Sequence, residues 1–211
     1  QQVPFITNGA GSAIGLLKNS IGKTIVPIAS PANMASLRPI YTQHADSLFQ
    51  PMMYNSDNFF AEQTLLMAAL KVKGVMNEKA LIDALLSTDL KNLPQKPRWV
   101  DGSGLSRYNL FSPDDFVWIL NKMKDEFGIE RLKGILPTGG KGTLKGYYQK
   151  DSAFIFAKTG TLSGQLALSG FLITQKNRLI LFSVLINNHQ SNTSELRKLV
   201  EKFLSGIRNR Y

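Results

Sequence analysis

Residues 154–161 read Phe-Ile-Phe-Ala-Lys-Thr-Gly-Thr and combine a buried-strand pattern with a polar end. The aromatic and β-branched residues favour a strand, and Lys158 interrupts them where that strand should leave the core. Thr159 and Thr161 stand two positions apart, so they face the same side of an extended backbone. Gly160 lacks a Cβ, so another group can approach closely there. A cation and two hydroxyls beside open N–H groups form a seat for a carboxylate or an oxyanion.

The tripeptide at 158–160 is short, and it also fits a strand end with a solvated lysine and a turn. A second tripeptide at 56–58, Ser-Asp-Asn, favours the chemical interpretation. Ser-x-Asn followed by Lys-Thr-Gly supplies, in order, two of the three signatures of penicillin-recognising serine acyl enzymes.

Longer blocks of sequence extend this match. Residues 54–63 contain Ser-x-Asn, residues 101–107 read Asp-Gly-Ser-Gly-Leu-Ser-Arg, residues 136–144 begin Leu-Pro and end Gly-Thr-Leu, and residues 158–164 contain Lys-Thr-Gly. With these blocks, the chain resembles the D-alanyl-D-alanine carboxypeptidase/endopeptidases of the low-molecular-weight penicillin-binding protein type, peptidase family S13. The similar blocks run from about residue 30 to residue 188.

The resemblance implies a penicillin-binding protein/β-lactamase-like transpeptidase fold, present in part, that acts on peptidoglycan stem peptides. A serine attacks the bond between two D-Ala residues, and an acyl-enzyme forms without metal or cofactor. On this resemblance, Ser56 would relay a proton to the leaving amine. Asn58 would donate its amide to the substrate. β-Lactams would be covalent inhibitors of the full-length enzyme, which would work in the periplasm or otherwise outside the cytoplasmic membrane.

The same resemblance assigns substrate binding to residues 158–161. Lys158 would supply a positive field for the substrate carboxylate, and Thr159 and Thr161 would hydrogen-bond it. Gly160 would allow close approach, and the Thr161 N–H would form half of the oxyanion hole.

The third signature, Ser-x-x-Lys, has no convincing copy. Ser20 and Lys23 match its letters, but the nucleophile must begin a buried helix so that the lysine one turn later reaches its Oγ. Here Gly22 lies inside the motif, a helix is expected before it at 12–18, and a strand after it at 24–28. We therefore expect residues 1–211 to be the C-terminal part of a single penicillin-binding domain, inactive alone.

Two alternatives stay open. One is a non-catalytic peptidoglycan-binding or scaffolding module that keeps the fold and has lost the chemistry. The other is a β-lactamase or esterase of the same fold, although the Asp-Gly-Ser-Gly-Leu-Ser block argues against it.

Composition excludes several function classes. With 211 residues, 43% hydrophobic and 19% charged, the chain is typical of one globular domain. It has no cysteine and two histidines, which excludes thiolate chemistry and disfavours a multi-histidine metal site. The net charge of +10 is dispersed rather than clustered, which disfavours nucleic acid and suits an anionic cell-wall polymer or peripheral contact with a membrane.

Periodicity predicts helices first and an antiparallel sheet afterwards, hence the α+β class. Residues 1–11 are expected to form a loop or frayed end, and 29–36 another loop. Expected helices are 12–18, 37–53, 60–73, 77–88, 113–127 with Ser112 as its cap, and 194–207. Expected strands are 24–28, 153–158, 165–174 and 178–187, the last two joined by a turn at 175–177.

Five further expectations concern individual side chains. Asp57 should turn outward or cap the following helix, and Glu62 should order the Ser56 turn. The Asp101 block should be a structural Asx-turn. In the helix at 60–73, the inward residues should be Leu65, Leu66, Ala69 and Leu70. The apolar stripe of the last helix, Leu196, Leu199, Val200, Phe203 and Leu204, should pack on the hairpin.

Overall fold

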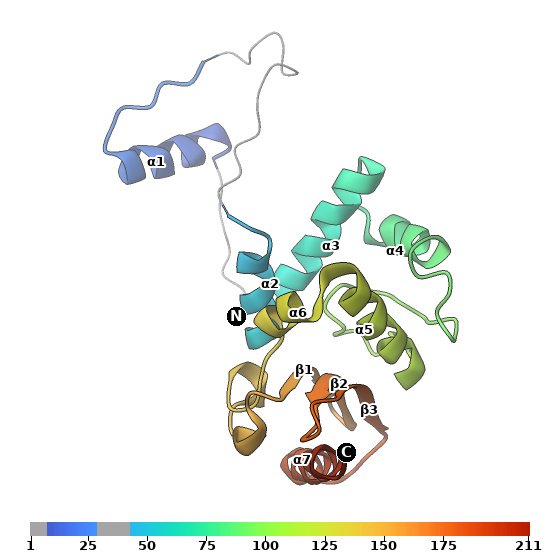
Figure 1. Ribbon diagram of the computed structural model, residues 1–211. Coiled ribbons are helices and arrows are strands. Elements are labelled where there is room, and N and C mark those ends of the chain that lie inside the picture. Colours follow the sequence, from blue (N-terminus) through green and yellow to red (C-terminus); the bar gives the residue numbers. More distant parts are fainter. Residues whose placement is uncertain (1–7, 29–42) are drawn as a thin grey trace. The chain divides into compact units, whose positions relative to one another are not determined.

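The computed structural model describes residues 8–28 and 43–211 (Figure 1). The chain divides into two compact units, Gln1–Thr42 and Gln43–Tyr211. The described part of the first unit contains one helix, α1 (Ala10–Ile21). The second contains α2 (Asp46–Asn55), α3 (Asn58–Lys73), α4 (Glu78–Ser87), α5 (Pro113–Phe127), α6 (Ile129–Ile135), the 3-10 turns η2 (Gly142–Leu144) and η3 (Gln149–Asp151), β1 (Ile155–Leu162), β2 (Gln165–Ile173), β3 (Leu179–Asn187) and α7 (Thr193–Arg210).

In the first unit, both ends of one predicted helix and one predicted strand are wrong. Helix α1 begins at Ala10, inside the predicted loop at 1–11, and continues past the predicted end at residue 18. The predicted strand at 24–28 is wrong, because those residues have no regular secondary structure. Val26 is 71% exposed and Ile28 is 86% exposed, so nothing described supplies the neighbouring strand that a β-conformation needs. The predicted loop at 29–36 and the start of the predicted helix at 37–53 lie outside the described residues.

The sheet of the second unit is antiparallel, in the order β1-β2-β3. Strand β1 is longer than the predicted 153–158, because Lys158 pairs with Ser169 and Thr161 with Leu166. The Lys-Thr-Gly segment therefore lies inside a strand rather than after one. The chain turns only after Leu162, where Gly164 adopts a left-handed φ of 73°.

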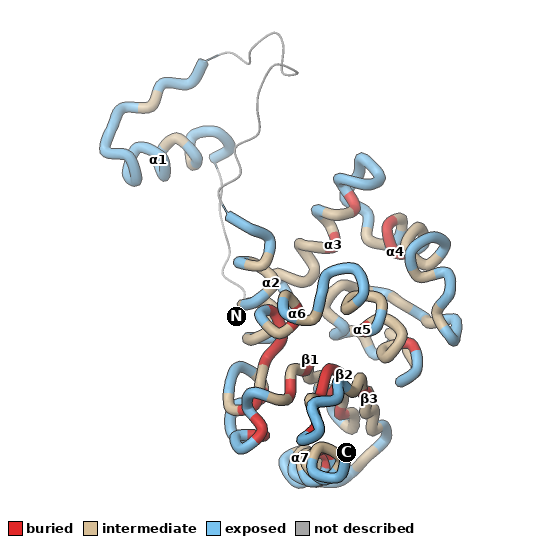
Figure 2. The backbone as a smooth tube through the Cα atoms, in the orientation of Figure 1, coloured by how far each residue is buried: buried red, intermediate tan, exposed pale blue. Residues whose placement is uncertain are grey.

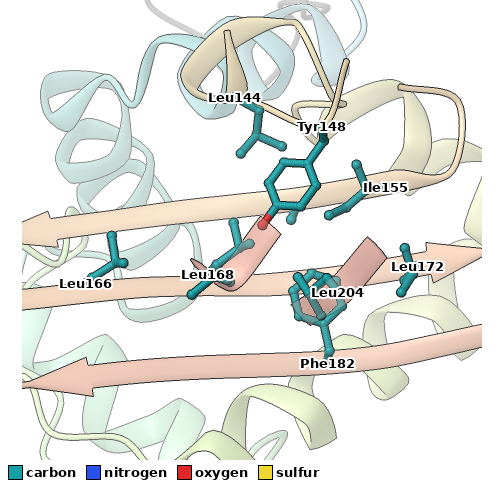
Figure 3. Close-up of a cluster of buried hydrophobic side chains, with 10 residues drawn as sticks. Leu144, Tyr148, Ile155, Leu166, Leu168, Leu172, Phe182 and Leu204 are labelled. Carbon is teal, nitrogen blue, oxygen red and sulfur yellow. The ribbon is translucent and has the colours of Figure 1, made fainter. Parts of the chain in front are cut away.

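Helices cover both faces of the sheet. On one face, Ile155 and Ala157 of β1 share a buried cluster with Val200 and Leu204 of α7 (Figure 3). On the other face, Phe171 of β2 packs with residues of α5 and α6. Strand alternation follows from these two clusters: odd-numbered β1 residues face α7, and even-numbered ones face the remaining helices.

Helices α3 and α4 form a separate buried cluster next to the sheet layers. Leu65 and Ala69 of α3 are buried there as predicted, but Leu70 is 46% exposed, so its predicted inward position is wrong. Leu66 is only partly buried. The carboxylate of Asp115 accepts from the N–H of Ser112 and completes a capping box that confirms the predicted start of α5.

Helix α7 packs on the sheet with only part of its apolar stripe. Val200 and Leu204 are buried, as predicted. Leu199 and Phe203 are each 62% exposed, so their predicted packing on the hairpin is wrong, and Figure 2 shows the outer side of α7 as exposed. Among the described helices, none has both the length and the apolar character needed to cross a bilayer.

Candidate active site

The Ser56 turn joins two helices through a single left-handed residue. Helix α2 ends at Asn55, and Ser56 adopts φ 52° and ψ 51° while its N–H bonds to the carbonyl of Met52. The Asp57 carboxylate then caps α3 by accepting from the N–H of Phe60 at 2.9 Å, which confirms the predicted capping role. Asn58 is the exposed first residue of α3. The local geometry thus presents Ser56 and Asn58 on either side of a capping aspartate.

Lys158 reaches this turn from the sheet. Its Nζ donates to Ser56 Oγ at 2.8 Å, although 102 positions separate the two residues, and also to the carbonyl of Thr159 at 2.7 Å. Burial lowers the pKa of Lys158 from 10.5 to about 8. The structure therefore brings the two predicted tripeptides together on the face of β1 opposite α7.

The outer edge of β1 is half closed and half open. Its first part is closed by the preceding loop, because the N–H of Ala157 donates to the carbonyl of Pro137 at 2.9 Å and Thr138 Oγ1 donates to the carbonyl of Ile155 at 2.8 Å. Alternate N–H groups of a strand point to the same edge. The N–H groups of Thr159 and Thr161 therefore point to the same edge, where no described residue accepts a hydrogen bond from them.

Thr159 and Thr161 face α7, away from Lys158, because side chains alternate along a strand. Arg197 of α7 donates from Nη2 to Thr161 Oγ1 at 2.8 Å. The sequence-based interpretation missed Arg197. A signal was present, since Arg197 precedes Val200 by three positions and Leu204 by seven, and a cation therefore stands on the buried stripe of an amphipathic helix.

The Asp101 block is a hydrogen-bonded loop, as predicted. The Asp101 carboxylate accepts from the N–H groups of Gly104 and Ser106, both at 2.7 Å, and from Asn109 Nδ2 at 2.8 Å. Arg107 of the same block donates to the carbonyl of Ser163, just after β1, at 2.9 Å. The block therefore braces the end of the strand that carries Lys-Thr-Gly.

Glu62 supports the Asp101 block, and the predicted role at the Ser56 turn is wrong. Its carboxylate accepts from the N–H of Gly102 at 2.9 Å and from the N–H of Ser103 at 3.0 Å. Glu62 lies on α3 one turn after Asn58, so the helix that begins at the Ser-x-Asn motif also holds the loop. Gly102 is required at this contact, because a Cβ there would lie 2.9 Å from the carbonyl oxygen of Ala61.

The Gly-Thr-Leu block packs against the end of α2. A Cβ at Gly142 would lie 2.9 Å from the carbonyl oxygen of Tyr54, and Gly142 also has a left-handed φ of 53°. Only glycine fits both conditions. The contact supports the helix end that leads into Ser56.

Ser20 and Lys23 do not share a helix. Helix α1 ends at Ile21, and Gly22 takes a left-handed φ of 67° before Lys23. Lys23 is therefore not placed one helical turn beyond Ser20, as a Ser-x-x-Lys pair requires. Within 8–28 and 43–211, no group of three His, Cys, Asp or Glu residues is arranged to hold a metal ion.

Comparison with known proteins identifies a family that this chain matches. The sequence model of the D-Ala-D-Ala carboxypeptidase 3 (S13) family matches residues 19–206. D-alanyl-D-alanine carboxypeptidase DacB of Haemophilus influenzae is 26% identical over 176 residues, which are 80% of this chain and 34% of that protein. The chain thus spans about a third of the length of this curated relative.

Solved structures show the same fold at low identity. Penicillin binding protein 4 of Haemophilus influenzae, in a β-lactam complex, has a TM-score of 0.70 at 20% identity, covering 97% of this chain and 53% of that one. The penicillin G-acylated predatory endopeptidase of Bdellovibrio bacteriovorus, bound to an immunity protein, has a TM-score of 0.66 at 15% identity, covering 98% and 60%. The fold is therefore the α+β penicillin-binding protein/β-lactamase-like fold, and the chain belongs to the D-Ala-D-Ala carboxypeptidase 3 (S13) family.

Proposed function

We propose that this chain is the C-terminal part of one penicillin-binding domain in a serine-type D-Ala-D-Ala carboxypeptidase/endopeptidase. The substrate would be the D-Ala-D-Ala end of a peptidoglycan stem peptide, and a location in the periplasm or otherwise outside the cytoplasmic membrane follows from that substrate. The observation that carries the proposal is the 2.8 Å hydrogen bond from Lys158 Nζ to Ser56 Oγ. Membership in the family supports the reaction class.

The reaction would proceed through an acyl-enzyme. A serine hydroxyl from outside the 211 residues attacks the carbonyl of the penultimate D-Ala, and a neighbouring neutral lysine takes its proton. Ser56 then relays a proton to the leaving D-Ala amine, while Lys158 orients the Ser56 hydroxyl and adds positive charge. Water finally hydrolyses the ester. The serine of a Ser-x-x-Lys pair is the missing component, since Ser20 lacks the required geometry.

The remaining residues would bind substrate and stabilise charge. Asn58 donates its amide to the acyl-side carbonyl of the peptide. The N–H of Thr161 supplies one donor of the oxyanion hole, and removal of one such donor costs about 3–4 kcal/mol in other enzymes. Thr159 and Thr161 hydroxyls bind the terminal carboxylate, and Gly160 keeps the approach to the backbone open.

Penicillin labelling followed by intact-mass measurement tests the proposal. The 211-residue chain should give no covalent adduct, and the longer protein should give one adduct per molecule. In the longer protein, Ser56→Ala should slow adduct formation by about 100-fold or more, because a positioned proton relay contributes that much. Ser87→Ala, at the exposed end of α4, is the matched control and should leave the rate unchanged.

Other outcomes separate the alternatives. An adduct on the 211-residue chain that disappears with Ser20→Ala would make Ser20 the nucleophile and overturn the assignment. Binding of peptidoglycan by the longer protein, with neither adduct nor D-Ala release, would instead identify a non-catalytic module. Rapid hydrolysis of the penicillin without a stable adduct would identify a β-lactamase.

A further inference from the structure

Two cations lie on opposite faces of β1, and only one of them is on the side of the threonine hydroxyls. Lys158 lies on the face of β1 opposite α7 and donates to Ser56 Oγ. Thr159 and Thr161 face α7, where Arg197 donates to Thr161 Oγ1 at 2.8 Å. Sequence proximity assigns the carboxylate-binding charge to Lys158, but strand alternation separates Lys158 from the two hydroxyls that would share that carboxylate.

Arg197 has unused hydrogen-bonding capacity. Its Nε is buried and has no hydrogen-bond partner within the described structure. No Asp or Glu of residues 8–28 or 43–211 lies within ion-pair distance of its guanidinium. Arg208, on the same helix, also has an Nε without a described partner, but its guanidinium pairs with Asp151 at 3.3 Å. An arginine stays charged at any physiological pH, so Arg197 is a permanent cation that no described carboxylate neutralises.

Arg197 borders a small cavity between α7 and the sheet. Arg197, Thr143 and Thr159 contribute to one partly open cavity of about 20 Å³, which is enough for a single water and is otherwise lined by apolar and tyrosine side chains. Thr143 Oγ1, like Arg197 Nε, is buried there without a described partner. The Tyr147 ring, 5.8 Å from the guanidinium, closes one side. Thr143 belongs to the Gly-Thr-Leu block, so this block contacts the cavity beside Arg197 as well as α2.

The state of the Thr161 hydroxyl also favours an anion. Because Thr161 Oγ1 accepts from Arg197, its own proton is free to donate outward. A carboxylate at this position would accept from Thr161 Oγ1 and from the guanidinium together, and the planar fork of arginine suits two such oxygens. Lys158, by contrast, already commits two of its three N–H donors to Ser56 and the carbonyl of Thr159.

We propose that Arg197, rather than Lys158, is the cation that binds the terminal carboxylate of the substrate peptide, together with the hydroxyls of Thr159 and Thr161. Lys158 then serves the proton relay through Ser56. This inference rests on the proposed function for its substrate and goes beyond it by separating the two charges. It makes Arg197 a specificity-determining residue that distinguishes a peptide with a free C-terminus from one with a blocked C-terminus.

The first test measures turnover in the longer protein with a D-Ala-D-Ala peptide and with its C-terminal amide. Arg197→Gln should lower kcat/KM for the free peptide about 100-fold, mainly through KM, and should leave the amide within about twofold, because only the free peptide offers a carboxylate. Arg197→Lys should recover part of the loss. Lys198→Gln removes one charge from an exposed neighbour and is the matched control, expected to change neither substrate. Equal losses for both peptides in Arg197→Gln would overturn the inference.

A second test does not depend on catalysis and separates this inference from the proposed function. N-acetyl-D-Ala-D-Ala is titrated into the 211-residue chain while the side-chain Nε–H resonance of Arg197 is observed by NMR. A saturable shift that the C-terminal amide does not produce, and that persists in Lys158→Met, supports the inference even if the longer protein proves inactive. No shift, or a shift lost in Lys158→Met while the fold is intact, overturns it.

Discussion

The two edge strands of the sheet differ in what lies along their outer sides. The loop at Pro137 and Thr138 closes the first half of β1, and the second half carries the site residues. Strand β3 reads Leu-Ile-Leu-Phe-Ser-Val-Leu-Ile-Asn, and no described strand pairs with its outer edge. The exposed Leu199 and Phe203 of α7 add further apolar surface.

The two edges of one sheet therefore differ in role: the β1 edge carries the site residues, and the β3 edge affects solubility. The polar edge of β1 can be open because its side chains are hydrated or hydrogen-bonded. An open apolar edge such as β3 is a surface prone to self-association. Substitutions along β1 should therefore change catalysis and folding, whereas substitutions on the β3 and α7 side should mainly change association.

The largest expected effect comes from Lys158→Met in the longer protein. The change removes the charged donor to Ser56 Oγ, and we expect penicillin acylation to fall by about 10³-fold or more. Stopped-flow or intact-mass kinetics measure the rate. Lys176→Met, in the turn between β2 and β3, is the matched control and should retain the wild-type rate. Equal acylation rates for the two variants would contradict the proposed functional difference between the β1 edge and the rest of the sheet.

The next effect concerns the contact between β1 and the central strand. A Cβ at Gly170 would lie 2.2 Å from the carbonyl oxygen of Phe156, so Gly170→Ala must push β1 away from β2. We expect the free energy of unfolding to fall by about 3 kcal/mol, measured by urea denaturation. Gly134→Ala lies in α6 with nothing within 4 Å of the new Cβ, and it should be neutral or slightly stabilising. A neutral Gly170→Ala would contradict the tight β1–β2 packing.

The pH dependence of stability should report the buried charge of Lys158. Its pKa is about 8 in the folded chain, below the ordinary 10.5, so the unfolded chain binds more protons between these values. The free energy of unfolding should therefore rise with pH, by about 1–3 kcal/mol across the window. Tyr148, whose pKa burial raises, works in the opposite direction above pH 10. Urea denaturation between pH 7 and 9.5 should show the rise in wild type and in Lys176→Met, but not in Lys158→Met.

The smallest effect on stability is expected on the α7 surface. Leu199→Gln combined with Phe203→Gln should change the free energy of unfolding by no more than about 0.5 kcal/mol, because both side chains are largely exposed. Sedimentation velocity should nevertheless show less self-association of the 211-residue chain. A loss of stability above about 1 kcal/mol, or unchanged association, would mean that this surface does not differ from the β1 side in the way described.

Local sequence signals predicted much of the framework. The Ser112 capping box, the Asp57 cap and the Asp101 turn all depend on partners within eight positions along the chain, so residue type and spacing were enough to predict them. Periodicity predicted the β2–β3 hairpin and the described helices for the same reason, except for the short helix α6, which was missed. Periodicity failed at 24–28 and at Leu199 and Phe203, where the outcome depends on which surface lies opposite.

The sequence by itself determined the α+β class, the order of the motifs and the side-chain chemistry available to the site. Only the tertiary structure decided that Lys158 contacts Ser56 across 102 positions, and that Glu62 supports the Asp101 block instead of the Ser56 turn. It also decided that the Lys-Thr-Gly segment lies within β1, with Lys158 and the threonines on opposite faces and Arg197 beside the threonines. The physical reason is that strand pairing and helix packing set which faces meet, and these contacts join residues far apart in the chain.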